Sequence, residues 1–149
     1  MNPITRITPD FAVTGELQEP DFAEIAAQGF KAVINNRPDG EAPGQPTARE
    51  QEEIARKHGL DYAHVPATTQ TIFTDEVVSA MEKALNSVEG PVLAHCKSGM
   101  RSTVLWAVAS ARSKPVSEVV AALEQSPFDM SFLEEELEKQ AAHTDTQTT

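Results

Sequence analysis

Short apolar runs alternate with longer amphipathic stretches along most of the chain. The apolar runs are bounded by turn-forming residues such as proline, glycine, asparagine and aspartate, which is the pattern of short strands in a buried sheet. On this pattern we predict strands at residues 4–7, 11–13, 31–35, 61–65 and 91–95.

Between these runs, apolar residues recur at the three- and four-residue spacing of amphipathic helices. Thr47 and Thr74 open two such segments with side chains suited to capping a helix amino terminus, and Gly29 and Gly59 follow two others as terminators. We predict helices at residues 20–28, 47–58, 74–88, 102–113, 116–125 and 130–140. Residues 141–149 lack a hydrophobic pattern and are expected to form a frayed tail.

This alternation of strands and helices is typical of an α/β domain with a mainly parallel sheet. We expect residues 1–140 to form a single catalytic domain, in which helices flank a sheet of four or five strands. The first βαβ unit predicts parallel pairing of residues 11–13 with residues 31–35 through a right-handed crossover. Ligands bind at the carboxyl ends of strands in such sheets, and three loops leave strands there: residues 36–46, 66–71 and 96–101.

Residues 96–101, called the cysteine loop below, carry the clearest chemistry. The loop begins with the sole cysteine, Cys96, ends with Arg101, and leads into an apolar helical run. Gly99 permits a positive φ, so backbone N–H groups can face inward as an anion-binding nest at a helix amino terminus. The planar fork of Arg101 can then grip an oxyanion beside a Cys96 thiolate nucleophile. The expected anion-binding residues are Lys97, Ser98, Gly99, Met100 and Ser102.

Two sequence motifs carry a family resemblance. HCKSGMRS, residues 95–102, resembles protein tyrosine and dual-specificity phosphatases in its leading His95 and trailing Ser102. The four residues between Cys96 and Arg101 resemble the shorter loop of rhodanese-type sulfurtransferases. Together with NRPDGE, residues 36–41, which looks like an NLRPDGE signature, the motif is similar to the beta-lactamase-hydrolase-like (Blh) phosphatase-like domain family. The resemblance runs from about residue 4 to residue 137 and implies a cysteine-phosphatase-like fold.

Other polar residues are candidates for supporting roles. Arg37 lies in the loop that follows a predicted strand, at the edge of the sheet where ligands are expected to bind. It is therefore predicted to reach the mouth of the Cys96 pocket. Asp39 and Glu41 either line the same mouth or bind the backbone of their own loop. His95 either orients the cysteine loop through a hydrogen bond or simply ends a strand.

The amino-acid composition narrows the possible partners, cofactors and cellular location of the protein. The chain has 149 residues, a net charge of −11 and one cysteine, which excludes an internal disulfide and fits a reducing compartment. The acidic balance argues against nucleic-acid and acidic-membrane partners. No apolar run reaches transmembrane length, and the amino terminus has no signal-peptide layout, so a cytoplasmic location is expected. No spacing indicates a metal site, and no cofactor is expected.

A lone cysteine is more often a small buried hydrophobe than a nucleophile, but the strand–loop–helix setting favours catalysis by Cys96 and Arg101. A phosphatase, acting on a phosphate ester through a Cys96 thiophosphate, needs a general acid for the leaving group. The 66–71 loop, where dual-specificity phosphatases carry this acid, contains no carboxylate or histidine. Asp75 is explained by helix capping, which leaves Asp39 as a substitute acid.

Sulfur transfer needs no such acid. A small anionic donor resembling thiosulfate would leave a persulfide on Cys96, and a thiol acceptor would then remove the sulfur. The missing acid and the short cysteine loop both favour this rhodanese-like sulfurtransferase reaction, with phosphoric ester hydrolysis as the alternative. A non-catalytic anion-binding module is the remaining possibility, and it is disfavoured because binding alone requires no thiolate.

Overall fold

The computed structural model describes residues 1–148, with side chains described through residue 142. Within these residues, five strands form one sheet in the order β1-β2-β5-β3-β4. β1 is antiparallel to β2, and every other neighbouring pair is parallel. Each predicted strand is present, with the bounds β1 Thr5–Thr8, β2 Phe11–Thr14, β3 Ala32–Asn35, β4 Asp61–His64 and β5 Val92–His95.

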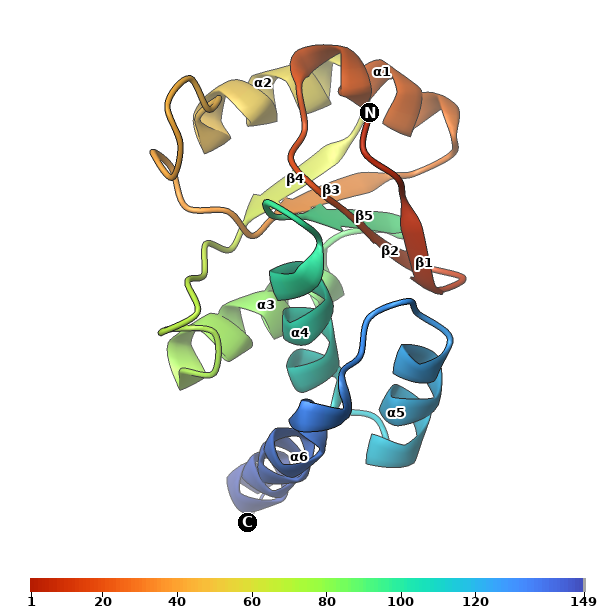
Figure 1. Ribbon diagram of the computed structural model, residues 1–149, viewed down its shortest axis with the longest axis vertical. Coiled ribbons are helices and arrows are strands. Elements are labelled where there is room, and N and C mark those ends of the chain that lie inside the picture. Colours follow the sequence, from red (N-terminus) through yellow and green to blue (C-terminus); the bar gives the residue numbers. More distant parts are fainter. Residues whose placement is uncertain (149) are drawn as a thin grey trace.

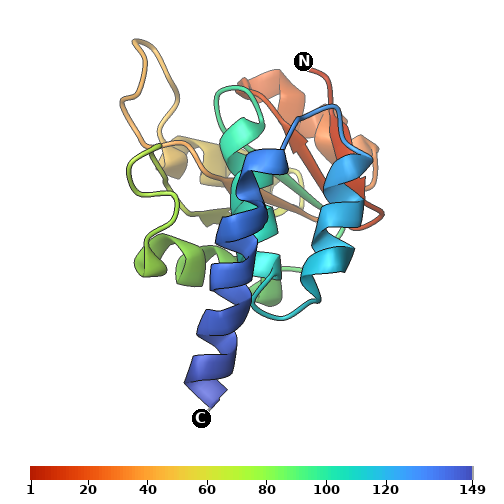
Figure 2. The ribbon, with the colours of Figure 1, turned by 60° about the horizontal axis from the view of Figure 1, so that its bottom comes forward.

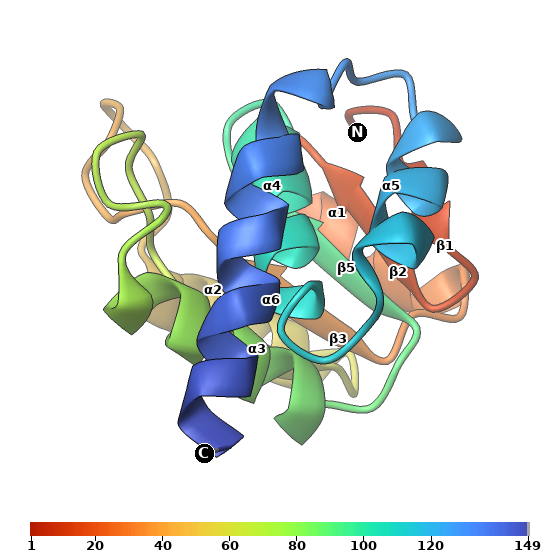
Figure 3. The same cartoon turned by 90° about the horizontal axis from the view of Figure 1, so that it is seen from below.

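Helices cover both faces of this sheet, as Figure 1 shows. α1 and α2 lie on one face, and the remaining helices lie on the other. α6 packs on α4 and α5, and it runs along α4 in Figures 2 and 3. The helical bounds are α1 Glu19–Ala27, α2 Ala48–Lys57, α3 Asp75–Ser87, α4 Met100–Ser110, α5 Val116–Glu124, the 3₁₀ turn η1 Ser131–Leu133 and α6 Glu134–Thr148. None of these described helices is long and apolar enough to cross a membrane.

The central strand β5 is buried along its whole length, and its side chains alternate between two cores. Leu93 packs in the core beneath α1 and α2 with Phe22 and Val33. Val92 and Ala94 face the core on the other side of the sheet, which also contains Leu105 of α4. β5 therefore has packed neighbours on both faces and hydrogen-bonded neighbours on both edges.

The predicted direct pairing of residues 11–13 with residues 31–35 is wrong. β2 pairs with one edge of β5, and β3 pairs with the other edge, so β5 separates them. The crossover rule fixes the direction and handedness of a βαβ unit, but it leaves room for a later strand to insert between its two strands. The inserted strand is the one that carries Cys96.

The predicted helices differ from the observed ones mainly at their ends. α4 begins at Met100 rather than at residue 102, because Gly99 takes the N-cap position with a φ of 92°. A 3₁₀ turn replaces the start of the helix predicted over residues 130–140, and α6 then continues to Thr148. The tail expected to be frayed thus begins inside α6, since no proline or glycine stops the helix there, and Thr149 lies outside the described residues.

Candidate active site

The cysteine loop connects the carboxyl end of β5 to the amino end of α4. Cys96 is fully buried, and its Sγ accepts a hydrogen bond from the backbone N–H of Gly99 at 3.1 Å. Gly99 has a positive φ that other residues rarely adopt, and this conformation turns the chain directly into the helix. The sulfur atom thus lies at the positive end of the α4 dipole, as the sequence predicts.

Glu41 and the backbone of Ala67 hold the guanidinium of Arg101. Nη1 and Nη2 each donate to one carboxylate oxygen of Glu41, both at 2.8 Å, and Nη1 also donates to the carbonyl oxygen of Ala67 at 2.8 Å. The hydrogen bond to Glu41 raises the pKa of Arg101, and the electrostatic interaction with Cys96 acts in the same direction. Arg101 is therefore a fixed cation beside the sulfur, and its orientation comes from the 36–46 and 66–71 loops.

Glu41 is shared between two arginines. Its Oε1 accepts from Nη2 of Arg101 at 2.8 Å and from Nε of Arg37 at 2.9 Å. The hydrogen bond from Arg101, followed by the one from Arg37, lowers the pKa of Glu41 to about 2 against the opposing effect of burial. The carboxyl group is consequently ionised at neutral pH, so it serves Arg101 as a counter-ion and not as a proton donor.

Arg37 lies at the predicted edge of the sheet, but it is buried behind Glu41. Its Nε and Nη1 donate to Glu41 and to Glu16, the latter at 3.2 Å. Its Nη2 is also buried and has no hydrogen-bond partner among the described residues. The side chain thus acts on Arg101 through Glu41 and does not line an open mouth above Cys96.

Asp39 accepts a hydrogen bond from a backbone N–H, but that group belongs to α2 and not, as one of its two predicted roles had it, to the loop of Asp39 itself. Its Oδ1 accepts from the backbone N–H of Ala48 at 2.8 Å, at the first turn of α2. The 36–46 loop is held further by Gln45, whose side chain donates to the carbonyl oxygen of Pro38. Asp39 therefore fastens its loop to α2, while Glu41 of the same loop extends to Arg101.

The other predicted residues divide into exposed and buried groups. Lys97, Ser98 and Met100 are exposed on the cysteine loop, where their side chains face solvent. Ser102 is buried in the first turn of α4, and its Oγ has no hydrogen-bond partner among the described residues. His95 is buried as well. Its Nε2 lies 3.0 Å from Oε1 of Gln51, and this contact fixes the ring against α2.

Two contributors were absent from the predicted site. The carbonyl oxygen of Ala67 cannot be recognised from sequence, because any residue supplies one. Gln51 could have been noticed, since it occupies the inward face of α2 between Ala48 and Ala55, at the i, i+3 and i+7 spacing of a buried stripe. A polar residue in such a stripe requires a buried partner, and His95 is one of its partners.

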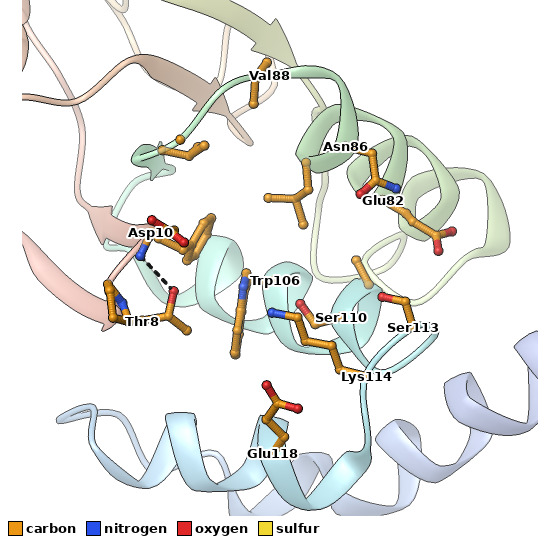
Figure 4. Close-up of a pocket in the computed structure, with 16 residues that line it drawn as sticks. Thr8, Asp10, Glu82, Asn86, Val88, Trp106, Ser110, Ser113, Lys114 and Glu118 are labelled. Atoms are coloured by element: carbon orange, nitrogen blue, oxygen red, sulfur yellow. Dashed lines mark hydrogen bonds between the residues drawn. The ribbon is translucent and has the colours of Figure 1, made fainter.

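A separate groove of about 630 Å³ lies at the other end of the strands. Figure 4 shows Trp106, Lys114 and Glu118 around it, together with Asp10 and Glu82. Its wall includes Phe11 and Val92, the first residues of β2 and β5, whereas Cys96 follows the last residue of β5. The groove is therefore remote from the cysteine loop.

Comparison with protein families supports the assignment made from the two motifs. The family model described as beta-lactamase hydrolase-like protein, phosphatase-like domain, matches residues 4–113. Beta-lactamase hydrolase-like proteins of Agrobacterium fabrum and Xylella fastidiosa strain 9a5c are 35% and 37% identical over 92% and 95% of this chain. The aligned regions cover 32% and 33% of those relatives, so the chain spans about a third of their length.

Solved structures show the same architecture. A candidate phosphatase from Neisseria meningitidis Z2491 has a TM-score of 0.76 and 27% identity, covering 92% of this chain and 97% of its own. A candidate phosphatase from Shewanella putrefaciens CN-32 has a TM-score of 0.70 and 17% identity, covering 97% and 94%. The core catalytic domain of the PP-IP phosphatase SIW14 from S. cerevisiae has a TM-score of 0.57 and 13% identity, and the match covers 93% of this chain and 86% of that domain. At this identity the likeness shows the fold alone. These likenesses confirm the predicted cysteine-phosphatase-like fold.

Proposed function

The chain belongs to the family of beta-lactamase hydrolase-like phosphatase-like domains, and from that premise we propose that it hydrolyses phosphate monoesters through Cys96. The observation that carries this proposal is the pairing of a buried sulfur at a helix amino terminus with an arginine whose orientation is fixed by Glu41 and Ala67. The proposal reverses the preference for sulfur transfer, because the family and the structural neighbours are phosphatase-like.

The proposed reaction has two displacements at phosphorus. The Cys96 thiolate attacks the phosphorus atom, the ester P–O bond breaks, and the departing oxygen takes a proton from solvent. Water then attacks the thiophosphate, which breaks the S–P bond and releases inorganic phosphate and the thiolate. Arg101 and the backbone N–H groups of the cysteine loop stabilise the negative charge that the equatorial oxygens carry in both transition states.

The protonation of the leaving group limits the substrates. The 66–71 loop contains no carboxylate or histidine, and Asp39 is committed to the backbone of Ala48. Glu41 is ionised beside two arginines, so it holds no proton to give. Because general acid catalysis contributes roughly 10²–10⁴-fold, we expect esters with good leaving groups, such as aryl phosphates, to react much faster than alkyl phosphates.

Sulfane-sulfur transfer is the second candidate, and the same missing acid favours it. Thiosulfate would give one sulfur atom to the Cys96 thiolate as its S–S bond breaks, and sulfite would leave as a stable anion that needs no proton. A thiol acceptor would then take that sulfur from the persulfide. The four-residue interval between Cys96 and Arg101 supports this candidate as well.

One pair of measurements separates the two reactions. Hydrolysis of an aryl phosphate is followed by phosphate release, with Cys96→Ser as the inactive control. In parallel, the reduced protein is incubated with thiosulfate, freed of excess reagent and weighed intact. Brisk hydrolysis without a mass gain supports the phosphatase. A mass gain of one sulfur atom that a small thiol reverses, without hydrolysis of the aryl phosphate, supports the transferase. If the protein shows neither hydrolysis nor a mass gain but does bind phosphate, the result supports a binding module.

A further inference from the structure

The groove at the amino ends of β2 and β5 is a second candidate site, far from the chemistry of Cys96. It lies between the β1–β2 turn, the carboxyl-terminal parts of α3 and α4, and the start of α5. Its volume of about 630 Å³ falls within the range of roughly 300–1,000 Å³ that is usual for small-molecule sites. The groove therefore has room for a small free molecule.

Trp106 forms part of the floor and carries a hydrogen-bond donor that lacks a partner. Its ring stacks on that of Phe11, with the centroids 5.8 Å apart, and its side chain is only 4% exposed. None of the described residues accepts a hydrogen bond from its indole nitrogen, which Figure 4 shows among the side chains that line the groove. A buried indole N–H usually has an acceptor, so this donor is available to a molecule in the groove.

Lys114 brings a positive charge next to this donor. Its backbone N–H donates to the carbonyl oxygen of Ser110 at 2.8 Å, which fixes the residue at the carboxyl end of α4. Its Nζ lies 6.0 Å from the centroid of the Trp106 ring, and it forms no salt bridge with a described carboxylate. The negative end of the α4 dipole explains a lysine here, but it does not explain the unpartnered indole. Together the two donors suit the oxygens of a carboxylate.

The rim of the groove has the opposite charge. Asp10, Glu82 and Glu118 line it from three different elements, as Figure 4 shows. Asp10 and Glu118 are exposed and form no salt bridge with a described residue, whereas Glu82 lies 3.7 Å from Nη1 of the buried Arg112. The carboxyl ends of α3 and α4 add negative potential at the same place. The rim consequently attracts a positive group.

We propose that this groove binds a small zwitterion with one carboxylate, one ammonium and an apolar side, the simplest example being a free amino acid with an apolar side chain. Its carboxylate accepts from the indole N–H of Trp106 and faces Lys114. Its apolar side packs on the floor, and its ammonium faces Asp10 or Glu118. A simple anion would be repelled by the rim, and a simple cation would leave both floor donors without an acceptor. The inference goes beyond the proposed function, because it uses no residue of the cysteine loop.

A merely structural role for these residues predicts something different. An ammonium near the face of an indole contributes modestly to stability, and this contribution requires no ligand. Only a binding site predicts a saturable response of Trp106 to an added zwitterion. Trp106 is the sole tryptophan of the chain, so its indole N–H gives one identifiable NMR signal in the full-length protein.

The experiment titrates the ¹⁵N-labelled protein with free phenylalanine and follows this indole signal. Two matched compounds, phenethylamine and 3-phenylpropionate, keep the phenyl ring but lack the carboxylate and the ammonium respectively. We expect a saturable shift with phenylalanine and binding roughly tenfold weaker for each of the two, on the scale of one charge-assisted hydrogen bond. Free leucine, a zwitterion with an aliphatic side chain, should also saturate the site.

Two variants assign the charges. Lys114→Met keeps the apolar stem and should weaken phenylalanine roughly tenfold while leaving phenethylamine unchanged. Asp10→Asn should weaken phenethylamine and leave 3-phenylpropionate no weaker. Lys57→Met is the matched control, because it removes the same charge from an exposed position on α2, on the other face of the sheet.

The absence of a saturable shift with both phenylalanine and leucine would overturn the inference. Equal affinities for the three phenyl compounds would overturn it too, because they would indicate apolar adhesion alone, and so would equal losses in Lys114→Met and Lys57→Met. Cys96→Ser should bind phenylalanine as the wild type does. Because the titration contains no phosphate ester, failure of the proposed hydrolysis and failure of this site are separate results.

Discussion

Glu41 and Arg101 are 60 positions apart in the sequence, yet they form a two-pronged ion pair with both N–O distances at 2.8 Å. The pair brings a loop that follows β3 onto the residue that ends the cysteine loop after β5. Arg101 is thereby oriented before any anion arrives, and a preoriented cation stabilises developing charge better than one that must first be ordered.

Substitution of Glu41 by Gln should therefore impair turnover while leaving the fold intact. The uncharged amide cannot accept from both nitrogens of Arg101, so the guanidinium gains freedom. We expect a fall of about tenfold in kcat/KM for an aryl phosphate, on the scale of one charge-assisted hydrogen bond. Glu16→Gln is the matched control, because Glu16 pairs with Arg37 and has no bond to Arg101; equal losses in the two variants would contradict the role given to Glu41.

Replacement of Arg101 by Lys tests the geometry of the clamp rather than its charge. A lysine ammonium keeps the positive charge but cannot donate to both oxygens of Glu41 and to Ala67 while facing a bound anion. We expect a loss of about 10²-fold or more in kcat/KM, measured by phosphate release. Full activity in Arg101→Lys would show that a point charge is sufficient.

Asp39→Ala should lower stability and spare activity. Its carboxylate binds the backbone N–H of Ala48 at the start of α2, and loss of such a contact costs about 1 kcal/mol. Urea unfolding should show this decrease, and Thr47→Ala, which removes a cap from the same helix at the N–H of Glu50, should show a similar one. A collapse of aryl phosphate hydrolysis in Asp39→Ala at near-normal stability would instead identify Asp39 as the missing general acid.

Acid should weaken the fold partly through Glu41. Its pKa in the folded protein is about 2, against an ordinary value of 4.5, so the unfolded chain binds a proton at this group more readily. The contribution to stability is therefore complete above pH 4.5 and is lost as the pH falls toward 2. Urea unfolding at several pH values should give a shallower loss over this range in Glu41→Gln than in the wild type, and parallel curves would contradict the assignment.

The sequence predicts the elements and the location of the site because both depend on local patterns. Short apolar runs between turn residues indicate the strands, and the carboxyl ends of parallel strands share one edge, so the 36–46 and 66–71 loops were expected near Cys96. The choice between Asp39 and Glu41 could not be made in this way. It depends on the path of a loop with several prolines and glycines, where a shift of two residues exchanges which carboxylate extends to Arg101.

The order of the strands was likewise beyond the sequence pattern. The residues of β2, β3 and β5 are similarly apolar, so nothing in them indicates which strand occupies the centre. The partner of Gln51 was hidden for a related reason, since α2 and β5 meet only when the sheet is assembled. The motif predicts the chemistry that is proposed for Cys96 and Arg101, whereas the residues that contact them became known only from the tertiary structure.

The central place of β5 has a consequence for how this scaffold can change. Cys96 follows the strand with the least freedom to move, while the 36–46 and 66–71 loops leave β3 and β4, toward one margin of the sheet. Insertions in surface loops are tolerated far better than shifts of a central strand. New loops could therefore be grafted at these two positions, provided that Glu41 and the carbonyl of Ala67 keep their places. Loops of different sequence could then be carried by the same sheet while the sulfur of Cys96 kept its position.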